Sequence, residues 1–100
     1  MELIDMTVKE ALLACDGKFY GDEAVLSQKI SGAVIDSRKA EEGSLFIAIK
    51  GTKTDGYDYI PAAFKNGAVC AVSRKPYEGC ACIVVEDVEL ALGSIAKAYR

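Results

Sequence analysis

The chain has 100 residues, of which 51% are hydrophobic and 27% are charged, a composition typical of a soluble globular protein. This length predicts one domain, residues 1–100, with one modest core. The net charge of −3 argues against general nucleic-acid binding, which needs a basic face. No apolar run approaches the ~18 residues that span a membrane, and no basic segment followed by an apolar one opens the chain, so we expect a cytoplasmic protein.

Four cysteines and no histidine limit the chemistry that this chain can perform. A zinc site usually needs two Cys-x-x-Cys pairs or added histidines, and the closest pair here is Cys80 and Cys82, so we expect no metal site. Ser-His-Asp and Cys-His pairs are excluded, and no G-x-x-x-x-G-K-S/T phosphate loop is present. The sequence therefore predicts reduced thiols that pack as small apolar side chains, and it does not fit a self-contained hydrolase or NTPase.

The predicted elements begin with a helix. Thr7 and Glu10 match the S/T-x-x-E capping box, which predicts a helix that begins at Val8 and ends at Gly17 as its C′ residue. A continuous apolar run such as residues 45–49 is typical of strands covered on both faces, as in parallel sheets. The predicted strands are residues 18–20, 30–35, 45–49, 68–72 and 81–85.

Two further helices alternate with these strands. Asp58 is expected to cap a helix over residues 59–66, which Gly67 ends. Asp87 is expected to cap a last helix that is still running at Arg100, so we expect the natural protein to be longer. This alternation predicts an α/β fold with a small, mostly parallel sheet flanked by helices.

Polar side chains follow the predicted strand 30–35. Ser37 can donate and accept a short hydrogen bond, as a uracil edge or a ribose needs, and Arg38 carries a fork that suits phosphate oxygens. The segment can therefore hold a neutral ring with an anionic phosphate tail. A structural interpretation also fits, in which Asp36 pairs with Arg38 or ties down the turn and Ser37 caps the loop.

A second polar loop, residues 51–56, follows the predicted strand 45–49. Ligands of open α/β sheets bind at the carboxyl ends of the strands, where this loop begins. Its candidate ligand contacts are Thr52, Lys53 and Thr54, which supply two hydroxyl groups and one positive charge. The alternative is a solvated loop between a strand and a helix.

The two loops share one edge of the sheet only if the strands before them run parallel. The link over residues 38–44 is short for a parallel crossover, so the sequence leaves this question open. Arg74 and Lys75 form the other basic pair, which we interpret as part of a solvated turn.

A longer pattern runs through these segments. It consists of Asp36-Ser37-Arg38, Gly43 to Ala48, Lys50-Gly51, Asp55-Gly56 and Gly67-Ala68. The pattern resembles the N-terminal domain of the Mur ligases, the ATP-dependent amino-acid ligases of peptidoglycan synthesis. The chain departs from the family pattern at Ser44, where aspartate is usual, and at Tyr57, where histidine is common.

This resemblance implies a domain that binds the UDP portion of UDP-N-acetylmuramoyl-tripeptide. The residues expected to carry this binding are Ile35, Ser37, Arg38, Thr52, Lys53 and Thr54. It also implies that ATP and Mg are bound outside this chain, by central and C-terminal domains that are its partners in the same protein. ATP would there phosphorylate the peptide carboxylate of the substrate before an amine attacks it.

Segments near the two ends of the chain indicate which member of the family it resembles most. Residues 6–10 and 85–87 are similar to the member that adds D-alanyl-D-alanine. The alternative within the family is the member that adds the third residue of the stem peptide. An alternative of another class is an interaction or scaffold module that does not bind the nucleotide.

Overall fold

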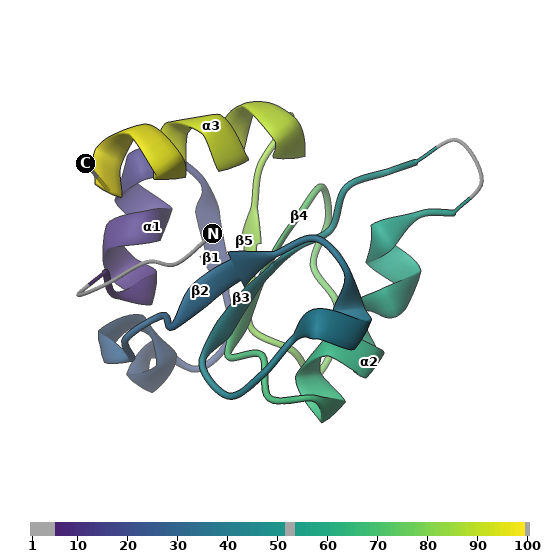
Figure 1. The fold of residues 1–100 in the computed structure, drawn as a ribbon. Helices are drawn as coiled ribbons and strands as arrows, with labels where there is room; N and C mark the ends of the chain where they lie inside the picture. Colours follow the sequence, from purple (N-terminus) through teal and green to yellow (C-terminus); the bar gives the residue numbers. More distant parts are fainter. Residues whose placement is uncertain (1–5, 52–53, 100) are drawn as a thin grey trace.

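A computed structural model describes residues 6–51 and 54–99 of the chain. In this part, five strands form one sheet in the order β1-β5-β4-β3-β2 (Figure 1). The strands are β1 (Lys18–Tyr20), β2 (Gly32–Val34), β3 (Ser44–Ile47), β4 (Cys70–Ser73) and β5 (Cys82–Val84). Neighbouring strands from β2 to β5 pair in parallel, and only β1 pairs antiparallel, with β5. The predicted α/β fold with a mostly parallel sheet is confirmed.

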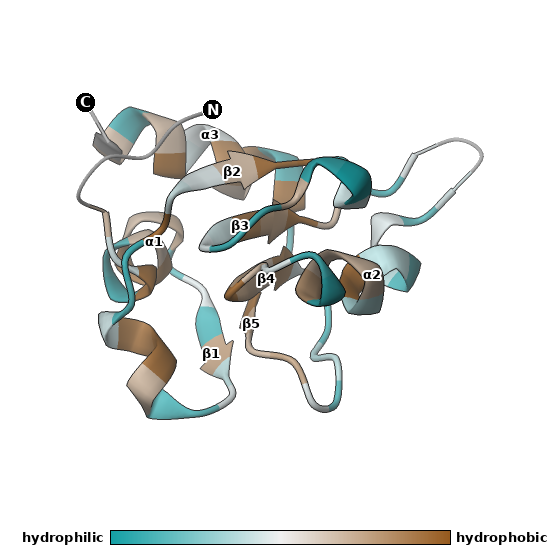
Figure 2. Cartoon of the chain, turned by 60° about the horizontal axis from the view of Figure 1, so that its bottom comes forward, coloured by the Kyte–Doolittle hydropathy of each residue, from teal (hydrophilic) through white to brown (hydrophobic). Residues whose placement is uncertain are grey.

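Helices cover both faces of this sheet. Helices α1 (Val8–Cys15) and α3 (Val88–Tyr99) lie on one face, and α2 (Ile60–Lys65) lies on the other (Figure 1). Leu45 and Ile47 pack with α1 and α3, whereas Phe46 between them packs with α2. Figure 2 shows the resulting apolar centre, with hydrophobic strands between the helices. This two-sided burial is why the strands read as continuous apolar runs.

The ends of α1 confirm one prediction and correct another. Thr7 Oγ1 accepts a hydrogen bond from the Glu10 amide (3.2 Å), and Glu10 Oε1 accepts one from the Thr7 amide (3.0 Å), as a capping box requires. At the other end Asp16, and not Gly17, adopts the left-handed conformation, with φ 54°. Gly17 is instead required by close packing, because a Cβ there would lie 2.6 Å from Ile83 Cγ2.

The start of α2 also differs from the prediction. The chain enters α2 through a 3-10 turn, η3 (Gly56–Tyr59), and Asp55 caps this turn by accepting a hydrogen bond from the Tyr57 amide (3.0 Å). Asp58, the predicted cap, therefore lies inside the 3-10 turn, and α2 begins only at Ile60. Asp87 caps α3 as predicted, through the Leu90 amide (3.0 Å). No helix in the described residues is long and apolar enough to cross a membrane.

Two connections between parallel strands contain no α-helix. The first, residues 35–43 between β2 and β3, contains only a 3-10 turn, η2 (Ser37–Lys39), that contacts α2. The second, residues 74–81 between β4 and β5, is irregular, and Tyr77 and Cys80 within it pack on the α2 face. Parallel crossovers usually need a helix to cover the sheet. Here the two connections and the short α2 cover this face of the sheet together. Because β2 and β3 run parallel, they end at the same edge.

Two glycines at positive φ allow the cost of backbone strain to be separated from the cost of close packing in the turns. Gly67 has φ 113°, and a Cβ there would lie 2.7 Å from the Glu42 amide nitrogen, whereas Gly79 has φ 85° with nothing within 4 Å. Gly79→Ala is expected to cost about 1 kcal/mol from backbone strain alone. Gly67→Ala should cost about 1–3 kcal/mol more, because the turn must also move away from the new methyl group. Urea unfolding measures both values, and equal losses would contradict the packing described for Gly67.

Candidate functional site

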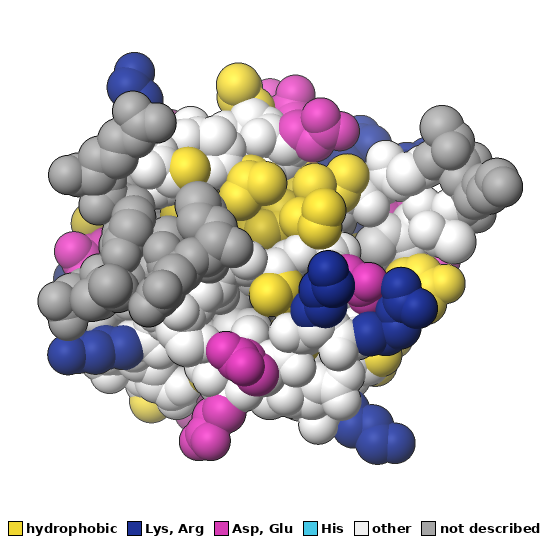
Figure 3. Space-filling view, in the orientation of Figure 1, with side chains coloured by type: hydrophobic (Ala, Val, Ile, Leu, Met, Phe, Trp, Pro, Cys, Tyr) yellow, Lys and Arg dark blue, Asp and Glu magenta, His cyan; other side chains and the backbone are white. Residues whose placement is uncertain are grey.

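The parallel strands β2, β3, β4 and β5 all end at one edge of the sheet, which we call the carboxyl edge. Both polar loops singled out in the sequence begin at this edge, after β2 and β3. Figure 3 shows hydrophobic side chains exposed in the same region, below α3 in the view of Figure 1. Ile35, at 62% exposure, and Leu90, at 70%, are the large apolar side chains exposed after β2 and at the start of α3.

The segment after β2 is held by its own hydrogen bonds. Asp36 Oδ1 accepts from the Arg38 amide (2.9 Å) and from Arg38 Nε (3.1 Å), and Asp36 Oδ2 accepts from Arg38 Nη2 (2.9 Å). The guanidinium beside it lowers the pKa of Asp36 from the usual 3.8 to about 2. Arg38 remains exposed, and Nε and Nη2 each donate one hydrogen bond to Asp36, so the two N–H groups of Nη1 and the second N–H group of Nη2 are left for a ligand.

Ser37 lies deeper than its neighbours. It is 7% exposed, and its carbonyl oxygen accepts a hydrogen bond from Asn66 Nδ2 (2.9 Å) at the end of α2. This bond ties the β2–β3 connection to α2 through the Ser37 backbone. The part of the structural interpretation that is confirmed is the pairing of Asp36 with Arg38 across the turn. The role of Ile35, Ser37 and Arg38 in binding remains a prediction.

The loop after β3 is only partly described. Thr52 and Lys53, two of the predicted contacts, lie outside the described residues. Thr54 is exposed, and its carbonyl oxygen accepts a hydrogen bond from the Gly51 amide (2.8 Å). Lys50 and Asp55 pair as an antiparallel bridge at the base of this loop. This bridge holds the described ends of the loop together between β3 and the η3 turn.

A cavity of about 320 Å³ opens at the carboxyl edge beside this loop. Its lining consists of Ala48, Lys50, Asp55, Tyr57, Arg74 and Lys75, and we call it the cationic cavity. Its three cations form no ion pair with any residue in the described part of the chain, and Asp55 is its one carboxylate. Clustered cations without acidic partners suit a multiply charged anion such as a diphosphate.

The sequence analysis did not identify the basic part of this cavity as a candidate site. Arg74 and Lys75 are exposed in a bend directly after β4, as predicted for a solvated turn, and they also line the cationic cavity. Lys50 joins them from three residues after the end of β3. Because β3 and β4 are parallel neighbours, residues beyond their ends meet at one edge. The signal that could have found them is the repeated placement of cations one to three residues after an apolar strand.

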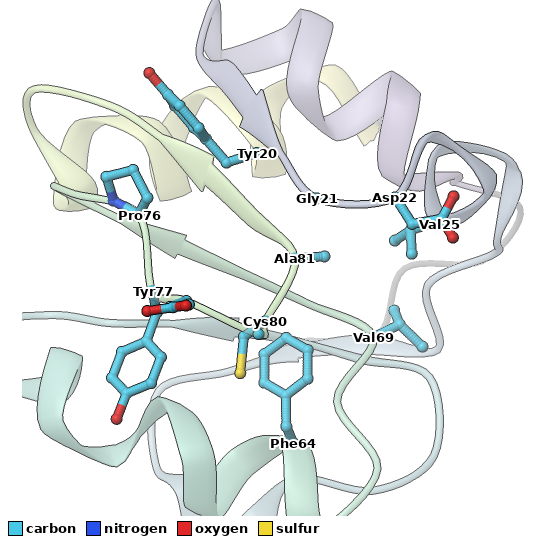
Figure 4. Close-up of a pocket in the computed structure, with 12 residues that line it drawn as sticks. Tyr20, Gly21, Asp22, Val25, Phe64, Val69, Pro76, Tyr77, Cys80 and Ala81 are labelled. Carbon is cyan, nitrogen blue, oxygen red and sulfur yellow. The ribbon is translucent and has the colours of Figure 1, made fainter.

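Two other cavities differ in their chemistry. Arg74 also lines a cavity of about 890 Å³ at the same edge, which holds Lys18 but also acidic residues such as Glu86 and Asp87. At the opposite edge, a cavity of about 700 Å³ is surrounded by Tyr20, Val25, Phe64, Val69 and other mostly apolar residues (Figure 4). The charged residues in its lining are acidic, namely Asp22 and Glu78, so this cavity does not suit a phosphate group.

The acidic and thiol side chains of the described residues are dispersed. These residues contain no group of three or more Cys, Asp or Glu side chains placed to hold a metal ion. Cys70 and Cys82 are fully buried in the core, as predicted for small apolar side chains, and burial raises the pKa of the Cys70 thiol to about 12. Cys15 and Cys80 are half-buried.

Comparison with known protein families gives one match that covers most of the chain. A family model described as "Mur ligase family, catalytic domain" matches residues 29–100. The chain is 48% identical over 73 residues, 70% of its length, to the UDP-N-acetylmuramoyl-L-alanyl-D-glutamate–2,6-diaminopimelate ligase of Caldanaerobacter subterraneus subsp. tengcongensis. It is 38% identical over 98 residues, 94% of its length, to the ligase of the same name from Thermosynechococcus vestitus.

Among solved structures, similar chains include MurF enzymes. MurF from Acinetobacter baumannii has a TM-score of 0.84 at 30% identity and matches 98% of this chain. MurF from Thermotoga maritima, solved in complex with ADP, has a TM-score of 0.61 at 31% identity and matches 70% of this chain. The chain spans only 15% and 20% of the two curated relatives, and 21% and 16% of the two structures.

The Asp36–Arg38 pair makes a direct prediction for titration. Since the pKa of Asp36 is lowered, the pair stabilises the turn at pH values above the usual carboxyl pKa of 3.8, and this stabilisation is lost as the pH falls through about 2. Carbon-13 NMR of the Asp36 carboxyl group is expected to show a midpoint near 2. Arg38→Ala should move the midpoint toward 3.8, and an unchanged midpoint would show that Arg38 does not hold the carboxylate.

Proposed function

Because the chain belongs to the Mur ligase family, we propose that residues 1–100 form the N-terminal domain of a peptidoglycan ligase and bind the UDP portion of UDP-N-acetylmuramoyl-tripeptide. The single observation that carries the binding proposal is the cationic cavity at the carboxyl edge of β3 and β4. It gathers three cations at the edge where open α/β sheets bind their ligands.

The dimensions of this edge support the proposal. Neighbouring strands lie about 4.8 Å apart, so the ends of β2 and β4 are separated by roughly 10 Å. A uridine diphosphate laid along the edge can therefore place its ring near Ile35 and the loop that carries Thr52, Lys53 and Thr54. Its diphosphate then reaches Lys50, Arg74 and Lys75. Ser37 and Arg38, through its remaining N–H groups, would contribute from the β2 side.

The contribution of this domain to the ligase reaction would be to position the substrate. Holding the nucleotide end fixes one end of a long substrate, which lowers the entropic cost of bringing its distant carboxyl group to the reacting centre. We place the sites of ATP and Mg in the central domain of the complete ligase, as the likeness to the Mur ligases implies. ATP supplies the energy for forming the new amide bond there.

Within the family we favour MurF, the ligase that adds D-alanyl-D-alanine. The likeness to MurF of A. baumannii over 98% of this chain supports this choice, together with the segments 6–10 and 85–87. The second candidate is the ligase that adds 2,6-diaminopimelate as the third peptide residue, which the 48% identity to the C. subterraneus enzyme favours. Assay of the complete ligase with each amine and its matching UDP-linked acceptor would separate the two.

The nucleotide proposal is tested by titrating the chain with UDP and following its backbone amides by proton–nitrogen NMR. We expect shifts at residues 35–38, 50–55 and 74–75. Arg74→Gln should weaken UDP binding about tenfold, since it removes one charge-assisted contact to phosphate, and should leave binding of uridine unchanged. Raising the salt concentration should weaken UDP binding to the unmodified chain, because exposed charges are screened.

Lys97→Gln is the matched control for this titration. Lys97 is exposed on α3, outside the cationic cavity, so the variant makes the same change in net charge without touching the site. UDP affinity should stay within about twofold of the unmodified value. Equal affinity for UDP and uridine, or shifts confined to the cavity at the opposite edge, would overturn the proposal.

A further inference from the structure

Tyr57 makes three contacts at the rim of the cationic cavity. Its hydroxyl group donates a hydrogen bond to the carbonyl oxygen of Pro76 (2.6 Å). The ammonium group of Lys75 lies over its ring, 4.5 Å from the centroid. On the α2 face its ring packs against Tyr77, with 5.2 Å between centroids. All three partners belong to the connection between β4 and β5, which contains no α-helix in the described residues.

The backbone around Lys75 is fixed by two hydroxyl groups in succession. The buried Ser73 donates from Oγ to the carbonyl oxygen of Lys75 (2.8 Å), and Tyr57 donates to the next carbonyl, that of Pro76. The carbonyl group of Lys75 and the next one along the chain are thereby held by side chains from different elements. The carbonyl oxygen of Pro76 can only accept, so the Tyr57 hydroxyl group is the donor of this bond, and partial burial raises the pKa of the phenol.

Lys75 forms no ion pair with any acid in residues 6–51 or 54–99. A lysine side chain without a partner samples many rotamers, and ordering it on a ligand costs side-chain entropy. The face of the Tyr57 ring restricts those rotamers through a cation–π contact while leaving the positive charge unneutralised. An aspartate or glutamate in the same place would hold the ammonium group but cancel the charge that an anion needs.

We propose that Tyr57 is a positioning residue for anion binding: it orders the β4–β5 connection and holds Lys75 at the cationic cavity. The inference rests on the proposed function and deepens it, since the anion is the diphosphate of the uridine nucleotide. Tyr57 stands where the family pattern commonly has histidine, and its hydroxyl group supplies the bond to Pro76 in this chain.

The test compares Tyr57→Phe and Tyr57→Leu in UDP titrations by calorimetry. Tyr57→Phe keeps the ring under Lys75 but removes the hydrogen bond to Pro76, so UDP affinity should fall about threefold. Tyr57→Leu removes both contacts, and UDP affinity should fall about tenfold. Uridine, which lacks phosphate, should bind all three proteins alike. Tyr59→Leu is the matched control, because Tyr59 lies in the same 3-10 turn but does not line the cavity.

A double-variant cycle separates positioning from direct contact with the nucleotide. If Tyr57 acts through Lys75, Tyr57→Leu should weaken UDP binding no further, within about twofold, in a Lys75→Met background. If the Tyr57 ring instead contacts the nucleotide itself, the two losses multiply, and the inference is overturned.

A ligand-free readout accompanies the cycle. The Lys75 side-chain protons near Nζ should show an upfield ring-current shift in the unmodified chain and in Tyr57→Phe, and should lose it in Tyr57→Leu. Ordinary shifts for Lys75 in the unmodified chain would overturn the inference, whatever the affinities.

The two proposals fail in different ways. If the unmodified chain does not bind UDP at millimolar concentration, the proposed function fails and this inference falls with it. If the unmodified chain prefers UDP to uridine but Tyr57→Leu binds UDP equally well, only the positioning role is lost. Should Tyr57→Leu not fold, Tyr57→Phe decides, since unchanged UDP affinity in that variant would exclude a role for the bond to Pro76.

Discussion

Burial of the central strands on both faces is the constraint on which the rest of this structure depends. Leu45, Phe46 and Ile47 of β3 are at most 1% exposed, and Cys70, Ala71 and Val72 of β4 are fully buried. Each large side chain of this kind stabilises the fold by roughly 1.5–3 kcal/mol when it leaves water, provided that both faces are covered. A chain of 100 residues must therefore cover both faces of the sheet with few and short helices and connections.

The two faces are covered in different ways. Helices α1 and α3 contact one another and cover the first face, where most of the buried core lies. The second face has only the six-residue α2, so the connections between β2 and β3 and between β4 and β5 complete its cover. These connections consequently pass close to the ends of the parallel strands. Because the short α2 does not cover the second face alone, these connections also pack on it, and their polar residues lie beside the carboxyl edge.

The electrostatics of the carboxyl edge follow from this arrangement. Arg38 is neutralised by Asp36, its neighbour within one turn, because an Asx-capped 3-10 turn brings the two side chains together. Lys50, Arg74 and Lys75 come from the ends of two different strands, and no acid in the described residues pairs with them. A positive cavity therefore forms in a chain whose net charge is −3. Local placement, and not overall composition, decides what this edge can bind.

The sequence by itself determined the fold class, the central apolar strands, the caps formed by Thr7 and Asp87, and the membership of the Mur ligase family, because short-range patterns encode each of these. Only the tertiary structure decided that β2 and β3 run parallel, that Asp55 and not Asp58 caps the turn before α2, and that Arg74 and Lys75 join Lys50 around one cavity. Those features depend on which segments cover the second face of the sheet. That choice is made by packing between residues far apart in the sequence, which no local pattern records.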